Sequence, residues 1–186
     1  MNLLALRDVA CWRGGRLLFE GLSFSLQAGD AMLVTGPNGS GKSSLLRLVA
    51  GLLRPLGGSV EAAHFALADE RPALDGELTL AKALAFWAPA NEDVAGALAA
   101  TGLDALADVP VRLLSTGQLR RASLARVSLG AAPLWLLDEP ANGLDIASLD
   151  LLASLVKRHL ANGGAVLAAS HQQLGGARWR TLELSQ

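Results

Sequence analysis

The sequence of 186 residues lacks several groups that particular protein classes require. Its single cysteine, Cys11, excludes an intrachain disulfide framework and is expected to pack as a small apolar side chain in the first strand. The formal net charge is −1, without the positive excess of a nucleic-acid clamp, so no nucleic-acid partner is expected. Mean hydropathy is +0.35, yet no apolar run approaches the roughly 20 residues of a membrane helix, and residues 1–8 lack an export-signal pattern.

What the sequence does contain is a glycine-rich loop at residues 36–43, which fits the pattern G-x-x-x-x-G-K-[ST]. An apolar run at 31–34, typical of a buried parallel strand, precedes the loop, and apolar residues at helical spacing follow it. Backbone N–H groups of such a loop bind phosphate, while Lys42 should reach the β- and γ-phosphates and Ser43 should ligate Mg²⁺. The predicted nucleotide-binding residues of this segment are Gly36, Pro37, Asn38, Gly39, Ser40, Gly41, Lys42, Ser43 and Ser44.

Two later apolar runs, 134–137 and 165–169, are followed by polar residues suited to nucleotide chemistry. Asp138 closes the first run and is predicted to hold Mg²⁺ together with Ser43. Glu139 is predicted to accept the proton of the water that attacks the γ-phosphate. His171 follows the second run after Ser170, and its side chain is expected beside the same phosphate. These three residues are the catalytic and metal candidates outside the loop.

The overall pattern predicts a single α/β domain with a mostly parallel core sheet and an antiparallel β edge. Extended segments are expected at 3–10, 17–26 and 60–67, besides the three apolar runs. Helices are expected from Lys42 to about Leu53, from Ser115 to about Gly130, and from Asp145 to about Leu160. Residues 69 to about 130 are predicted to form an inserted helical subdomain, between the two parts of the core at 1–68 and 131–186.

Residues 114–118, Leu-Ser-Thr-Gly-Gln, resemble the signature motif of ATP-binding-cassette (ABC) ATPases, and residues 142–145 resemble their D-loop. Four motifs of that family therefore occur in the family's order. The resemblance implies the cassette fold of P-loop NTPases, hydrolysis of ATP with Mg²⁺, and a head-to-tail dimer of two copies. It also implies that Ser115, Gly117, Gln118 and Asp145 face the ATP held by the other copy. The basic residues of this helix, Arg120, Arg121 and Arg126, are expected to pair on its surface.

Further sequence segments resemble one subfamily of these ATPases. Residues 13–24, 78–79, 85–87 and 159–166 are similar to the ATPase subunits of cytochrome c maturation transporters. That resemblance implies a peripheral subunit at the cytoplasmic face of the bacterial inner membrane. Its implied partner is an integral membrane subunit of the haem-exporter type.

The sequence departs from the family pattern at two positions. Most cassettes have a Gln between the core and the helical subdomain, where this chain has Asp69 and Glu70; either could substitute. An aromatic residue often stacks on adenine from the first strand, where this chain has Arg13 beside Trp12. Stacking by the Arg13 guanidinium is physically reasonable, and Trp12 as a packed strand residue is equally so.

Three alternatives stay open from the sequence. The first is a soluble ABC switch acting on a non-transport partner, although such proteins usually carry two cassettes or a long coiled-coil insertion. The second is a binding-only regulatory subunit, which the missing Gln favours and Glu139 with His171 disfavour. The third is an ABC transporter ATPase for another substrate, because the cassette does not contact the cargo.

Overall fold

The computed structural model describes residues 2–89 and 93–184, which contain two β-sheets and five α-helices. The first sheet is antiparallel with strand order β2-β1-β4, and the second is parallel with order β5-β6-β7-β3-β8. The strands are β1 (Asn2–Arg13), β2 (Arg16–Gln27), β3 (Ala31–Thr35), β4 (Gly57–Ala62), β5 (Phe65–Ala68), β6 (Leu134–Asp138), β7 (Ala165–Ala169) and β8 (Arg180–Glu183). The α/β prediction is therefore confirmed, with the antiparallel strands in a sheet of their own.

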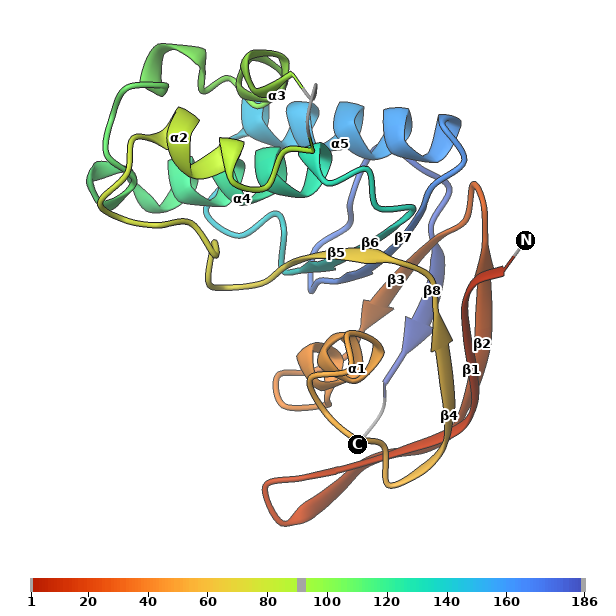
Figure 1. The fold of residues 1–186 in the computed structure, drawn as a ribbon. Coiled ribbons are helices and arrows are strands. Elements are labelled where there is room, and N and C mark those ends of the chain that lie inside the picture. The colour runs from red at the N-terminus through yellow and green to blue at the C-terminus, as the bar shows by residue number, and fades with distance from the viewer. Residues whose placement is uncertain (1, 90–92, 185–186) are drawn as a thin grey trace.

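The helices lie on both faces of the parallel sheet (Figure 1). They are α1 (Lys42–Val49), α2 (Leu80–Ala85), α3 (Val94–Ala100), α4 (Thr116–Leu129) and α5 (Ile146–Ala161), with short 3-10 turns at Asp104–Leu106 and Val111–Leu113. Helix α1 and the antiparallel sheet cover one face, and α4 and α5 cover the other. Within these described residues, no helix is long and apolar enough to cross a membrane.

Alternation along the central strands divides the core in two, because successive strand side chains point to opposite faces. In β6, Leu136 packs toward α1 and the antiparallel sheet, whereas Leu137 packs toward α4 and α5. A third apolar cluster lies away from the parallel sheet, where α2, α3 and α4 meet around Leu84, Leu98 and Leu129. Within residues 69–130, α2 and α3 therefore pack on one side of α4, while Leu124 and Val127 of α4 belong to the cluster that flanks the sheet.

Two predicted elements were wrong in extent, and one strand was not predicted. Helix α1 ends at Val49 rather than near Leu53, because Gly51 adopts a left-handed φ of 69°. The predicted strand 60–67 is two strands in different sheets, separated at Ala63, whose N–H donates to the Leu3 carbonyl. Strand β8 had no predicted counterpart.

Candidate functional site

A cavity of about 930 Å³ lies where the carboxyl ends of β3, β6 and β7 meet. The glycine-rich loop follows β3, Glu139 follows β6, and His171 lies two residues beyond β7; all of them line this cavity. Ligands of parallel α/β sheets bind at this edge, because the loops there converge. The predicted loop residues line the wall except Ser40, which is buried.

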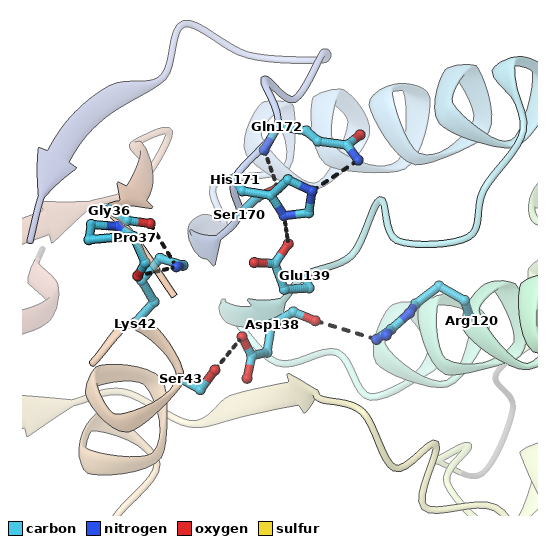
Figure 2. Close-up of polar contacts among 10 residues, drawn as sticks. All are labelled: Gly36, Pro37, Lys42, Ser43, Arg120, Asp138, Glu139, Ser170, His171 and Gln172. Carbon is cyan, nitrogen blue, oxygen red and sulfur yellow. Dashed lines mark hydrogen bonds and ion pairs between the residues drawn. The ribbon is translucent and has the colours of Figure 1, made fainter. Parts of the chain in front are cut away.

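The glycine-rich loop has a tight, internally bonded conformation. Gly36 adopts a φ of 139°, and a Cβ there would collide with the carbonyl oxygen of Leu184, so the close turn requires glycine. The Lys42 ammonium donates to the carbonyl oxygens of Gly36 at 2.8 Å and Pro37 at 3.1 Å (Figure 2). Lys42 is largely buried, so these bonds hold its charge inside the loop, at the N-terminus of α1.

Ser43 and Asp138 offer oxygen ligands of the kind that Mg²⁺ prefers. The Ser43 hydroxyl donates to Oδ1 of Asp138 at 3.0 Å, which joins the start of α1 to the end of β6 (Figure 2). Asp138 is only 4% exposed, and its burial raises the pKa of the carboxyl, while the Ser43 bond lowers it. A buried carboxylate beside a hydroxyl at the phosphate loop fits a divalent cation, whose charge would offset the desolvation of Asp138.

Glu139 and His171 contact each other at the rim of the cavity. Oε2 of Glu139 lies 2.9 Å from Nδ1 of His171, and Nε2 of that ring lies 3.3 Å from the Gln172 amide nitrogen (Figure 2). The Glu139 backbone has a left-handed φ of 48°, which is uncommon for a residue with a side chain. Its N–H donates to the Ala169 carbonyl at 2.8 Å, so the next strand holds this conformation.

The signature residues lie outside this cavity. Ser115 caps helix α4: its hydroxyl accepts from the Gln118 N–H at 3.3 Å, and the Gln118 side chain accepts from the Ser115 N–H at 2.8 Å. A Cβ at Gly117 would come within 3.0 Å of the Gly143 carbonyl oxygen, so the two motifs pack closely. Asp145 caps α5 by accepting from the Ser148 N–H at 2.8 Å, and this hydrogen bonding lowers the pKa of its carboxyl.

The expectation that the α4 arginines pair on the helix surface is corrected. Their guanidinium groups donate instead to backbone carbonyls of neighbouring segments. Arg120 donates to Asp69 and Asp138, Arg121 to Thr101 and Gly102, and Arg126 to Leu67 and Pro72. These residues therefore tie α4 to the end of β5, the end of β6 and the loop after α3, because carbonyl groups at segment ends need donors.

Replacing Arg126 with Met is expected to lower the free energy of unfolding by about 2–4 kcal/mol. Arg126 is 7% exposed and lies 4.8 Å from the centre of the Trp87 ring, so its loss leaves two carbonyls without this donor. Urea denaturation measures the effect. Arg112→Met is the matched control, because Arg112 is exposed and pairs with Glu77 at the surface. Equal shifts in the two variants would contradict the assignment.

In each of the two pairs of residues that the sequence left as alternatives, one residue lines the cavity and the other does not. Glu70 lines the cavity, whereas the Asp69 carboxylate accepts from the Arg71 N–H and lies outside it. Arg13 lines the cavity, whereas Trp12 is 53% exposed and does not. The wall also contains residues that the sequence did not indicate as nucleotide ligands, among them Arg16 and Asn142. For Arg16, the only indication in the sequence was the Arg-Gly-Gly-Arg segment, which is typical of a turn.

A phosphate loop between a buried parallel strand and a helix, with acidic residues at a second strand end, defines a P-loop nucleotide-binding protein. The model of the family described as ABC transporter matches residues 19–142. The chain therefore belongs to the ABC transporter family and carries its ATP-binding cassette. This confirms the resemblance to ABC ATPases that the sequence motifs indicated.

Individual relatives agree with this assignment. The cytochrome c biogenesis ATP-binding export protein CcmA of Zymomonas mobilis is 55% identical over 97% of this chain and 84% of its own length. The protein of the same name from Sphingopyxis alaskensis is 56% identical over 91% of this chain and 90% of its own. A solved ATP-binding subunit of an ABC transporter superposes with a TM-score of 0.83 at 24% identity, covering 91% of this chain and 79% of that one, which shows the shared fold.

Proposed function

We propose that the chain hydrolyses Mg-ATP to energise a membrane partner of the haem-exporter type in c-type cytochrome biogenesis. The family hydrolyses ATP in general, and the relatives named above are export proteins of cytochrome c biogenesis. The contact between Glu139 and His171 carries the hydrolytic half of the proposal, because it places a carboxylate and an imidazole at the rim of the phosphate-loop cavity. The proposed location is the cytoplasmic face of the bacterial inner membrane, as a peripheral subunit.

The roles proposed for the individual side chains follow from their positions. Lys42 leaves its loop carbonyls to bind the β- and γ-phosphates, and Ser43 and Asp138 hold Mg²⁺. When bound, Mg²⁺ neutralises charge on the phosphate oxygens. Glu139 accepts the proton of the attacking water, and His171 orients that carboxylate while contacting the γ-phosphate. The side chain of Glu139 is 20% exposed, so water can reach it.

A second copy of the chain is proposed to complete each site. Ser115, Gly117, Gln118 and Asp145 do not line the cavity that holds the phosphate loop, so they are free to serve the nucleotide of another copy. The N–H groups at the start of α4 suit an anion, because a helix N-terminus carries partial positive charge. Two copies related by a two-fold axis would then form two equivalent sites.

The proposed division into a core and an inserted subdomain at residues 69–130 gives this dimer a way to act on its partner. The separate apolar cluster around Leu84, Leu98 and Leu129 supports a body that can rotate as a unit. The bonds from Arg120 to the carbonyls of Asp69 and Asp138 join that body to the catalytic strand end. Closure around ATP would therefore be passed on as a rigid-body movement.

The membrane partner is tested by co-purification. Tagged Glu139→Gln, recovered from detergent-solubilised native membranes with Mg-ATP, is expected to bring with it a multi-span membrane protein that lacks its own cassette. Lys42→Ala is the comparison, because it removes the phosphate-binding ammonium and should not form the ATP-bound dimer. Mass spectrometry identifies the partner. Recovery with ribosomal or DNA-associated proteins, or as a soluble dimer alone, would support the alternative of a soluble ABC switch.

A further inference from the structure

The hairpin of β1 and β2 brings two arginines to the phosphate loop. Arg13 and Arg16 are cross-strand partners at its end, joined by Gly14 and Gly15, whose φ values are 60° and 79°. Nη1 of Arg13 donates to the Ser44 hydroxyl at 3.1 Å, and Nη2 of Arg16 donates to the Gly39 carbonyl at 2.7 Å. The tight turn therefore holds both guanidinium groups against the loop, one at Gly39 before α1 and the other at Ser44 in the first turn of α1.

The cavity wall beside these arginines offers no Phe or Trp ring among the residues the structure describes. The chain has no tyrosine, and Trp12, next to Arg13, is half exposed and outside the wall. Phe19 packs within the apolar cluster beneath the loop, where its ring approaches Gly41. A bound base would thus meet the guanidinium of Arg13 or Arg16 and the aliphatic side chain of Leu18.

The cavity is lined by charges of both signs: Glu70 and Glu139 are acidic, and three cations contact the phosphate loop. Arg13, Arg16 and Lys42 are three cations on one wall, and each bond to the loop uses one of the five N–H groups of a guanidinium. The remaining N–H groups can donate to phosphate oxygens, for which arginine is well suited. A guanidinium plane also stacks on any base without reading its edge.

We propose that Arg13 and Arg16 form a cationic clamp that makes the site select for the triphosphate and not for the base. The inference rests on the proposed nucleotide-hydrolysing function and adds a substrate class to it: nucleoside triphosphates irrespective of base, with ATP and GTP bound almost equally. Strong rejection of one base requires buried polar groups that hydrogen-bond its edge, and this wall presents arginine planes and Leu18 in that place. Because Arg13 and Arg16 are exposed, affinity also falls steeply with salt.

Isothermal titration of the full chain with Mg-ATP and with Mg-GTP tests this clamp. The two dissociation constants are expected to differ by less than about tenfold in the wild type. Arg13→Gln and Arg16→Gln should each weaken both nucleotides by a similar factor of about 5–30 and flatten the salt dependence. Arg7→Gln is the matched control, because Arg7 lies on the same strand but pairs with Glu61 at the surface. Its binding should equal that of the wild type.

Installing an aromatic face supplies the converse test. Arg13→Trp should reduce the salt dependence, since stacking replaces charge, and should leave the ratio of the ATP and GTP affinities unchanged, because an aromatic face stacks on either base. A wild-type preference for ATP above about tenfold, or arginine variants that weaken one nucleotide only, would overturn the clamp. Failure of the wild type to bind either nucleotide would instead refute the proposed function on which the clamp rests.

Discussion

Replacing Glu139 with Gln is expected to slow ATP hydrolysis by about 10²–10⁴-fold while leaving the affinity for Mg-ATP unchanged. Gln has the same shape and can still contact Nδ1 of His171, now 2.9 Å from the carboxylate, but it cannot accept a proton from water. Lys42, Ser43 and Asp138, which are proposed to bind the phosphates and metal, keep their mutual bonds. The loss should therefore fall on turnover and not on binding.

Phosphate release under saturating Mg-ATP measures the turnover of this variant, and titration calorimetry measures its affinity. Glu61→Gln is the matched control, because Glu61 makes an exposed pair with Arg7 in the antiparallel sheet, away from the cavity. Turnover of Glu139→Gln within a few fold of the control would remove Glu139 from the role of base. A joint loss of binding and turnover would mean that the carboxylate organises the nucleotide site.

The second large effect is expected at Ser115. Asp and Asn are both good helix N-caps, so Ser115→Asp and Ser115→Asn should each preserve the cap of α4 that the hydroxyl now provides. Only Asp adds a negative charge where the γ-phosphate of the other copy is proposed to lie. We expect Ser115→Asp to lose hydrolysis by at least about 100-fold, and Ser115→Asn to retain much more, with monomer binding of ATP unchanged in both.

Mixing Ser115→Asp with Glu139→Gln makes the arrangement in trans directly measurable. In a mixed dimer, one site combines the intact Glu139 of the first variant with the intact Ser115 of the second. Random exchange makes half the dimers mixed, each with one intact site, so about a quarter of wild-type activity should return. Activity that stays at the level of the separate variants would place Ser115 in the same site as its own Glu139.

The pattern of the sequence was sufficient for elements with strong local signals. The runs that became β3, β6 and β7 are continuously apolar because both faces of the parallel sheet are covered, and such runs are distinctive. Strand β8 was missed because Arg180–Glu183 is short and mostly polar, and its pairing with β3 depends on a partner about 150 residues away. The division between β4 and β5 was missed because nothing local at Ala63 and His64 indicates that the chain changes sheets.

Site residues in contiguous motifs could likewise be predicted, and those that depend on distant contacts could not. The phosphate loop, Asp138 and Glu139 lie in contiguous motifs, and the positions of strand ends then bring them together with His171. For Arg16, the sequence indicated only a turn, because its contact with Gly39 depends on the reach of a hairpin between two long strands. Which of Asp69 and Glu70 lines the cavity likewise depends on the path of the chain after β5, where the α4 arginines bind backbone carbonyls.

The left-handed backbone at Glu139 bears on how such a chain can change over evolutionary time. A side chain in this conformation costs about 1–2 kcal/mol, which glycine would not incur. Selection for stability alone would therefore favour loss of the carboxylate at this position. A glycine at this position would leave the fold and the phosphate loop intact and would remove the side chain that is proposed to act as the base.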